Sequence, residues 1–475
     1  MFHVKQKGVI LLINPWIYDF AAFDLWAKPL GLLYIAALLR NRGYEIAYID
    51  CLDIHHSTMV RERGVPKRRQ YHQGHFFKEN IEKPPALGDI PRKYRRYGIS
   101  EETFREQLEF FGEPKVVLVT SIMTYWYPGP FQVIRLVKER YPKAFVVMGG
   151  IYATLCQDHA RKYSNVDYIL PGDGLVKILD IVEKLLGGPS HEISQSSHLD
   201  GLAHPAFDLY PILDYVCILT SRGCPYRCEY CAAWKITRGF SQRDPKRVVD
   251  EIECWTSTFE VHDIAFYDDA LLADSKRHFI PMAKELLRRG MKCHYHTPNG
   301  IHGRELSHEI ASLMYEAGFK TIRLGLETSD AMRQKRLGDK ISNREMERAI
   351  AYLREAGFSR EDIGVYILAG LPGQRVSEVE ESIRFVRACG ATPKLAEYSP
   401  IPQTPLWEAA VRASEFDLRE EPLFHNNSIL PCRWEGFTWE DLQELKLRLR
   451  NSEKGLKPSP SSLDTISYAP PQGRT

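Results

Sequence analysis

Short apolar runs that end in glycine or a turn alternate with segments of helical periodicity along nearly the whole chain. Parallel strands joined by helices bring their carboxyl ends to one edge of a sheet, where ligands bind. The apolar runs of the first half cover residues 9–13, 44–50, 116–120, 144–148 and 168–170, and helical spacing marks residues 29–42, 131–140 and 175–186. This half is therefore predicted to be an α/β domain with a doubly wound, Rossmann-like parallel sheet.

The second half repeats the alternation with six further units. Its strands are expected at residues 216–221, 264–267, 294–298, 321–326, 363–368 and 395–399. The helices between them are expected at residues 245–259, 275–289, 306–317, 343–356 and 377–388. Six consecutive strand–helix units favour a partial (β/α)6 barrel, whose chemistry lies at the carboxyl ends of its strands.

Composition shifts divide the chain further. We expect the doubly wound domain at 1–190 with an insert at about 55–112, a polar linker at 191–214, the barrel at 215–410, a short helical region at 411–450, and a disordered tail at 451–475.

The overall charge gives no reason to expect nucleic acid as a partner, because 63 Lys and Arg nearly balance 61 Asp and Glu. The insert is locally basic, with eleven Lys and Arg against four Asp and Glu between Val60 and Gly98. It is either a site for an anion or nucleic acid, or a solvated insert whose Tyr94 and Tyr97 pack back on the sheet; we favour the second interpretation. No apolar run approaches the roughly 18 residues of a membrane span, and no signal peptide is recognisable, so we expect a soluble protein of the cytoplasm.

Three of the ten cysteines crowd into eight residues, as Cys224, Cys228 and Cys231 in a C-x3-C-x2-C pattern. Thiolates select zinc, copper(I) or iron–sulfur clusters. A structural zinc site normally has four ligands, commonly as two separated pairs, whereas three thiolates on a four-iron cluster leave one iron open for a substrate. A zinc site completed by a distant His or Cys is the alternative. The other seven cysteines are expected to be small, largely buried hydrophobic residues.

This spacing, with Tyr230 just before the last cysteine, resembles that of the radical S-adenosylmethionine (SAM) superfamily, and the resemblance extends over about residues 215–405. It implies a [4Fe–4S] cluster on the three cysteines and SAM on the open iron. It also implies contacts to SAM at the strand ends, for which the candidates are Tyr230, Asp268, Asp269, Asn299, Glu327 and Gly370. The two aspartates could instead make a turn or cap a helix, and Glu327 could be a structural ion-pair partner. Gln374 stands where relatives often carry an acid.

The first half resembles the N-terminal cobalamin-binding domain of one class of radical SAM enzymes. The resemblance implies that Gly149, Gly150 and Gly172 approach the corrin through their backbone. An ordinary dinucleotide-binding sheet is the alternative, although no G-x-G-x-x-G follows the first strand. The D-x-H-x-x-G motif that supplies a histidine to cobalt is also absent. We therefore expect His55 and His56, which follow the second strand, to be insert residues and cobalamin to bind without a histidine.

The sequence thus favours a methyltransferase that uses SAM, a [4Fe–4S] cluster and cobalamin to methylate an unactivated carbon of a small molecule or peptide. A radical rearrangement, cyclisation or coupling enzyme with non-methylating cobalamin is the first alternative, and a non-catalytic iron–sulfur and cobalamin sensor is the second. The resemblance also implies an electron donor such as flavodoxin or ferredoxin.

Overall fold

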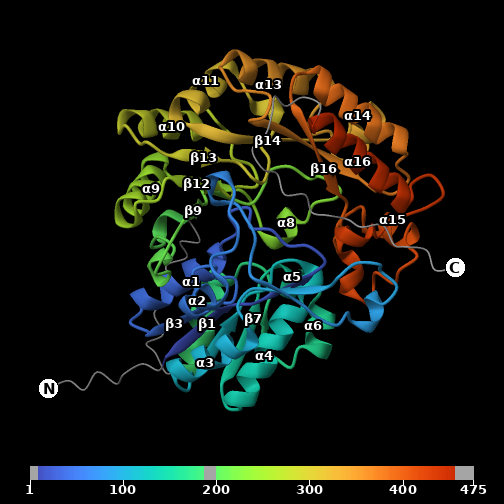
Figure 1. The fold of residues 1–475 in the computed structure, drawn as a ribbon. Coiled ribbons are helices and arrows are strands. Elements are labelled where there is room, and N and C mark those ends of the chain that lie inside the picture. Colours follow the sequence, from blue (N-terminus) through green and yellow to red (C-terminus); the bar gives the residue numbers. More distant parts are fainter. Residues whose placement is uncertain (1–8, 187–198, 455–475) are drawn as a thin grey trace.

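The computed structural model describes residues 9–186 and 199–454. The first part of the expected linker and the expected tail from residue 455 onward lie outside the described residues. Two lobes, each built on a parallel sheet, lie one above the other, and the short helix α8 (Ala233–Ile236) lies between them (Figure 1).

The N-terminal lobe confirms the predicted doubly wound sheet, with five parallel strands in the order β3-β1-β6-β7-β8. These strands are β1 (Ile10–Asn14), β3 (Ile46–Asp50), β6 (Val116–Val119), β7 (Phe145–Gly149) and β8 (Tyr168–Leu170). Successive side chains of β1 enter two separate cores, because neighbouring residues of a strand point to opposite faces. Helices α1 (Leu30–Asn41) and α7 (Gly174–Leu186) cover one face, and α3 (Glu101–Phe111) and α4 (Pro128–Arg140) cover the other.

The chain leaves β1 toward β3 on one side and returns to β6 on the other. This reversal creates a crevice beyond the carboxyl ends of β1 and β6, the position where open α/β sheets bind ligands. Two short helices, α5 (Ile151–Leu155) and α6 (Gln157–Tyr163), follow β7 along this edge.

The insert contains helix α2 (Ser57–Arg63) and two strands of a small antiparallel sheet that was not predicted; the third strand, β2 (Ile17–Asp19), follows β1. The order of this sheet is β2-β5-β4, with β4 (Lys78–Asn80) and β5 (Arg95–Tyr97). Tyr94 and Tyr97 are buried, as expected. However, Tyr94 packs in a cluster with Phe20 and with Leu423 and Ile429 of the C-terminal region, so the expectation that it covers the parallel sheet was wrong.

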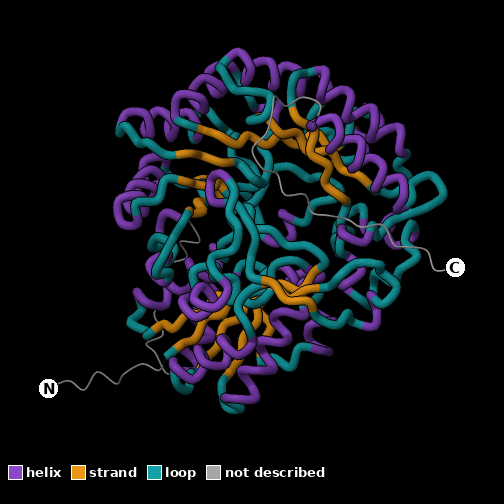
Figure 2. Tube along the Cα trace, in the orientation of Figure 1, coloured by secondary structure: helices purple, strands orange, loops and turns teal. Residues whose placement is uncertain are grey.

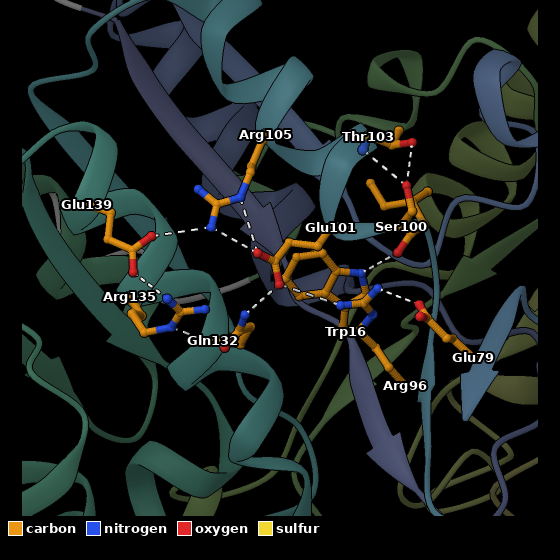
Figure 3. A network of polar contacts seen from close by, with 11 residues as sticks. Trp16, Glu79, Arg96, Ser100, Glu101, Thr103, Arg105, Gln132, Arg135 and Glu139 are labelled. Atoms are coloured by element: carbon orange, nitrogen blue, oxygen red, sulfur yellow. Dashed lines mark hydrogen bonds and ion pairs between the residues drawn. The ribbon is translucent and has the colours of Figure 1, made fainter. Parts of the chain in front are cut away.

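Many cations of the insert are held by neighbouring groups of the same chain. Arg96 pairs with Glu79 at 2.7 Å, and Arg68 pairs with Asp24 at 2.6 Å. Figure 3 shows Arg96 next to Glu101, whose carboxylate also accepts hydrogen bonds from Arg105 and from Gln132 of α4. These contacts favour the structural interpretation of the basic insert.

The second lobe contains the predicted open barrel, with six parallel strands in sequence order. They are β9 (Tyr215–Ile218), β12 (Asp263–Phe266), β13 (His294–His296), β14 (Phe319–Glu327), β15 (Ile363–Ala369) and β16 (Thr392–Glu397). In Figure 1 the helices follow the outer side of this curved sheet. They are α9 (Pro245–Phe259), α10 (Phe279–Arg288), α11 (His308–Ala317), α12 (Ala331–Arg336), α13 (Asn343–Glu355) and α14 (Val376–Ala388).

The two lobes share one apolar core and several polar contacts. Trp26 of the first lobe stacks on His296 of β13 with ring centroids 4.2 Å apart. The expected linker contributes Phe207 and Tyr210 to the same core, so this described part packs as an ordered segment. Arg222, just after β9, pairs with Asp173, just after β8, at 2.8 Å. The carboxyl edges of the two sheets therefore face each other, and loops fill much of the region between them (Figure 2).

The C-terminal region consists of α15 (Trp407–Arg412), two 3-10 turns (Pro422–His425 and Asn427–Ile429) and α16 (Trp439–Lys454). It contacts both lobes: Asn426 donates to Asp19 at 2.8 Å, and Leu430 packs over Gly370. Within the described residues, no helix is long and apolar enough to cross a membrane.

Candidate active site

The three clustered cysteines lie on one loop, residues 223–232, at the carboxyl edge of the barrel. We call this segment between β10 (Ser221–Arg222) and α8 the cysteine loop. All three cysteines are free thiols; Cys228 is buried, and Cys224 and Cys231 are half-buried. The pair β10 and β11 (Ser241–Gln242) closes the base of this loop. Gly223 has a φ of +75°, and a Cβ there would come within 2.1 Å of the Gly239 carbonyl oxygen, so this turn requires glycine.

The donor set of the loop fits an iron–sulfur cluster. Thiolates are soft ligands, and Cys224 has both other thiols among its charged neighbours. Burial raises the pKa of the Cys224 thiol to about 11, so a bound metal would have to stabilise its thiolate. Within the described residues, no three His, Cys, Asp or Glu side chains converge on one metal ion. Each thiolate of a four-iron cluster binds a different iron, so such convergence is not required.

Asp268 and Asp269 follow β12 but have different surroundings. The Asp268 carboxylate is buried and accepts hydrogen bonds from the Thr220 backbone N–H at 3.1 Å, the Thr220 hydroxyl at 2.8 Å and the Ser221 hydroxyl at 2.5 Å. Burial raises its pKa to about 6. Asp268 therefore fixes the end of β9 to the end of β12, and it neither makes a cap for α10, which begins at Phe279, nor lies free for a ligand.

Asp269 has an exposed carboxylate at the mouth of the barrel. It lies among the charged neighbours of Cys224 and Cys231. Its pKa is raised by partial enclosure within the chain. Of the two predicted aspartates, Asp269 is the one that the structure places toward the cysteine loop.

Glu327 ends β14 and forms a cluster with Tyr230 and Lys340, in which Glu327 is buried and the other two residues are half-buried. The Tyr230 hydroxyl donates to Glu327 Oε1 at 2.8 Å, and the Lys340 ammonium contacts the same oxygen and lies 3.1 Å from the Tyr230 oxygen. Burial alone would lower the pKa of Lys340, but the Glu327 carboxylate and the Cys228 thiol raise it above its ordinary value. The ion-pair role considered for Glu327 is thus present, and it lies directly behind the cysteine loop.

Lys340 was missed by the sequence reasoning. It lies in the loop between α12 and α13, 110 positions after Tyr230 in the sequence, and no motif marks it. The close approach does leave one signal: a Cβ on Gly325 would lie 2.6 Å from the Lys340 nitrogen, so glycine before Glu327 makes room for the ammonium.

A second polar contact supports the first half of the cysteine loop. The Tyr226 ring stacks on His302 with centroids 4.2 Å apart, and its hydroxyl donates to Glu305 at 2.7 Å. Burial lowers the pKa of His302 to about 3, so this imidazole is neutral. These residues were also not predicted.

The remaining predicted SAM contacts lie on neighbouring strand ends. Asn299 is exposed, and its amide donates to the Tyr267 carbonyl at 2.9 Å. Gly370 has a φ of +89° at the turn after β15. Gln374 holds that turn, because its side-chain oxygen accepts from the Gly370 and Leu371 backbone N–H groups. Gln374 therefore stabilises the turn by hydrogen bonds to its backbone.

In the N-terminal lobe, Gly149, Gly150 and Gly172 line one cavity of about 170 Å³ at the sheet's carboxyl edge, here called the glycine slot. Gly150 has a φ of +101°, and a Cβ there would come within 2.1 Å of the Ser121 carbonyl oxygen, so its glycine is required by the fold. Gly149 has ordinary space around it. Arg222, Ile236 and Thr237 from the barrel side close the slot.

Neither His55 nor His56 lines the glycine slot. His55 Nε2 lies 3.0 Å from Asp214 Oδ2, and His56 precedes α2. Both therefore lie in the insert, as expected.

Comparisons with known proteins agree with this arrangement. The Radical SAM superfamily model matches residues 218–386, which include the cysteine loop and four of the barrel strands that follow it. Residues 218–386 are therefore similar to the radical SAM domain. Such a domain implies an enzyme with a [4Fe–4S] cluster and SAM as cofactors.

Two solved structures define the class of fold more closely. The cobalamin- and cluster-bound radical SAM methyltransferase TsrM from Kitasatospora setae has a TM-score of 0.62 at 17% identity and covers 86% of this chain and 79% of its own. The cobalamin-dependent radical SAM enzyme OxsB has a TM-score of 0.53 at 12% identity and covers 94% of this chain and 62% of its own. The two-lobed fold of this chain is therefore similar to the folds of these two enzymes.

Curated relatives are distant but extend over both lobes. A cytidylyl-2-hydroxyethylphosphonate methyltransferase of Streptomyces wedmorensis is 23% identical over 93% of this chain and 89% of its own length. An uncharacterized methyltransferase of Pyrococcus horikoshii is 24% identical over 72% of this chain and 76% of its own length. An anaerobic magnesium-protoporphyrin IX monomethyl ester cyclase of Rubrivivax gelatinosus is 25% identical over 65% of this chain, but the match spans only 60% of that relative.

Proposed function

We propose that this chain is a cobalamin-dependent radical SAM methyltransferase that adds a methyl group to an unactivated carbon of a small molecule. The observation that carries the proposal is that the glycine slot and the cysteine loop face each other across the carboxyl edges of the two sheets. A methyl donor and a radical source must reach the same substrate carbon, and this arrangement provides sites for both. The relatives named as methyltransferases support the same function.

In this proposal Cys224, Cys228 and Cys231 hold the cluster, and Asp269 accepts the amino group of SAM. When bound, the cluster and SAM supply a carbon-centred radical that removes hydrogen from the substrate, and cobalamin supplies the methyl group. Asp268 fixes the two strand ends from which the cysteine loop and Asp269 project. Hydrogen bonds hold the cluster of Glu327, Tyr230 and Lys340 in place behind the cysteine loop, so these side chains need no reorganisation when SAM binds.

The glycine slot holds cobalamin mainly by shape and by backbone contact. Its lining is largely apolar, with Leu118, Val147, Leu170 and Ile178 below the glycines. His55 pairs with Asp214 outside the slot, which supports binding without a histidine on cobalt. An electron donor such as flavodoxin or ferredoxin, and a location in the cytoplasm, complete the proposal.

A second candidate function is a radical cyclisation or rearrangement in which cobalamin does not methylate. The specific observation that favours it is the similarity to the Rubrivivax cyclase. A non-catalytic sensor is less favoured, because a sensor does not need Asp269 and an open iron beside a second cofactor.

The test is to supply SAM with a labelled methyl group to the anaerobically reconstituted enzyme with cobalamin. We expect label on cobalamin and then on the product. 5′-Deoxyadenosine without label transfer would support cyclisation or rearrangement and contradict the methyltransferase proposal. Because the substrate is unidentified, label on cobalamin is measured first, and extracts of small metabolites then serve as the substrate source.

A further inference from the structure

A second, larger cavity continues from the glycine slot along the outer side of the cysteine loop. This groove has a volume of about 940 Å³, and its lining includes five cations. Lys177 and Arg222 lie on its two sides, and Arg227, Lys235 and Arg238 come from the cysteine loop and the segment after it. We call this cavity the basic groove.

The positive charge of the basic groove is not balanced within the described part of the chain. Asp173 is the one acidic side chain that lines it, and its carboxylate already pairs with Arg222 at 2.8 Å. Lys177, Arg227, Lys235 and Arg238 form no ion pair with any described carboxylate. These four exposed cations line one cavity, and a cavity lined by charges of one sign has a local potential that attracts the opposite charge, here an anion.

The aromatic side chain of Trp234 also lines the groove. Trp234 lies in α8, directly after the cysteine loop, and its indole N–H donates to the Cys231 carbonyl at 3.1 Å. The Arg227 guanidinium lies 4.9 Å from the Trp234 ring centroid, and the Lys235 ammonium lies 4.4 Å from it. These cation–π contacts hold two of the cations in place but leave their hydrogen-bond donors free for a ligand.

The position of the groove decides which molecule can use it. Five lining residues are common to the groove and the glycine slot: Gly172, Asp173, Arg222, Ile236 and Thr237. In the sequence, Arg227 of the groove lies between two of the clustered cysteines. A ligand in the groove would therefore lie beside both proposed cofactor sites. The volume is at the upper end of the roughly 300–1,000 Å³ of ordinary ligand pockets, so it suits a small molecule.

We propose that the basic groove binds a phosphate-type oxyanion that belongs to a molecule lying between the two cofactor sites. Arg227 and Arg238 supply the planar donor pairs that recognise such a group, and Lys177 and Lys235 add charge from the two walls. The anion has two possible sources: a phosphate or phosphonate of the substrate, or the phosphodiester of cobalamin's own nucleotide. The assignment to a substrate rests on the proposed function, whereas the anion site does not.

The test measures binding of inorganic pyrophosphate to the full-length, anaerobically reconstituted chain by isothermal titration calorimetry. The variant Arg227→Gln/Arg238→Gln should weaken binding at least tenfold, and Lys177→Gln, on the opposite wall, should weaken it about threefold. The matched control Arg344→Gln/Arg348→Gln removes the same two charges from exposed positions on α13 and should leave binding unchanged. Iron content and thermal stability of each variant show whether it still folds. Lys177 is an exposed residue of α7, outside the cysteine loop, so Lys177→Gln provides the test if the double variant does not fold.

Two further arms identify the source of the anion. If the substrate supplies it, the cobalamin-loaded chain still binds pyrophosphate, and the double variant binds cobalamin and cobinamide, which lacks the nucleotide phosphate, as the wild type does. If cobalamin supplies it, cobalamin displaces pyrophosphate, and the double variant weakens cobalamin binding but not cobinamide binding.

The proposal is wrong if wild-type protein does not bind pyrophosphate, or if the double variant and the α13 control bind it equally. It is also wrong if the variants leave pyrophosphate binding intact but weaken the docking of acidic flavodoxin, because the cations would then serve a protein surface. Failure of cobalamin to bind at all would contradict the proposed function and leave the anion site standing if pyrophosphate still binds.

Discussion

The glycine slot and the cysteine loop lie opposite each other but are built on different physical principles. The slot is lined mostly by glycines and aliphatic side chains, and its polar lining residues are Thr120, Asp173, Arg222 and Thr237. Around the cysteine loop, by contrast, side chains are held by other side chains: Asp268 by Thr220 and Ser221, and Glu327 by Tyr230 and Lys340. A large, flat ligand can be recognised by shape, whereas a charged reactive centre needs donors and charges in fixed positions.

This difference predicts that each site can be lost without the other. Variants that fill the slot should remove cobalamin and spare the cluster, and variants of the loop should do the reverse.

Replacing Cys224, Cys228 or Cys231 with Ala should abolish the cluster and reductive cleavage of SAM, because each thiolate holds a separate iron. Cobalamin binding should remain within about twofold of wild type. The measurements are iron and sulfide content together with cobalamin titration. Cys254→Ala and Cys389→Ala are the matched controls. A cluster that survives one of the three changes, or one that needs a fourth cysteine, would contradict the assignment.

Gly149→Val should weaken cobalamin binding at least tenfold, because the new side chain enters a slot of about 170 Å³ where a Cβ alone has only ordinary contacts. The cluster content and the melting temperature should change little. His55→Ala is the control and should leave cobalamin binding unchanged, because His55 pairs with Asp214 outside the slot. Dependence of cobalamin retention on His55 would show that a histidine ligates cobalt.

The Gly150→Val variant tests whether glycine at position 150 is required for the fold of the first lobe, in contrast to Gly149, which affects the space inside the slot. The left-handed backbone and the contact of 2.1 Å with Ser121 predict a destabilised first lobe, by at least about 1–3 kcal/mol for the backbone strain alone. Thermal unfolding of the cofactor-free protein measures this. Equal stability of the Gly149 and Gly150 variants would contradict the different roles given to the two glycines.

The variants Asp268→Ala and Asp269→Ala separate two roles: Asp268 stabilises the strand ends by hydrogen bonds, whereas Asp269 has an exposed carboxylate. Asp268→Ala leaves the buried Thr220 N–H without its acceptor, which costs on the order of 1–3 kcal/mol of stability. Asp269→Ala should leave stability unchanged and weaken SAM binding at least tenfold. Equilibrium SAM binding and thermal unfolding of the same preparations separate the two effects. Loss of stability in Asp269→Ala with full SAM affinity would reverse the assignment.

Lys340→Met should lower the reduction potential of the cluster, because it removes a half-buried cation beside Cys228 and leaves the Glu327 carboxylate in place. We expect at least a tenfold change in the reduction equilibrium, which is about 59 mV for a one-electron couple. Lys340→Arg should restore most of the potential. A purely structural role for Lys340 would change stability and leave the potential of the surviving cluster unchanged.

The sequence predicted the features that local periodicity encodes. Strand β8 and helix α9 begin and end where the pattern placed them. Gly149 is the last residue of β7, Gly150 follows it, and Gly172 lies two residues after β8. The small sheet of the insert was missed because its strands have three residues each and β4, Lys78–Asn80, is fully exposed. Such a short polar strand carries no alternation that could be recognised.

The missing parts of the site depend on contacts between distant segments. Lys340 reaches Tyr230 from another loop, and Trp26 reaches His296 from another lobe. Polar side chains of this kind have no periodic signal, because only the folded chain brings them together. The same reason explains why the sequence alone could not separate Asp268 from Asp269, which are adjacent and identical.

The most direct test of the account is the cofactor content of a single preparation. Protein purified anaerobically from cobalamin-fed cells should contain a four-iron cluster and one corrinoid per chain, seen together in its ultraviolet–visible spectrum and in iron, sulfide and cobalt analyses. The corrinoid should persist in Cys228→Ala and the cluster in Gly149→Val. Stoichiometric zinc without sulfide, or a cluster with no corrinoid, would contradict two facing cofactor sites.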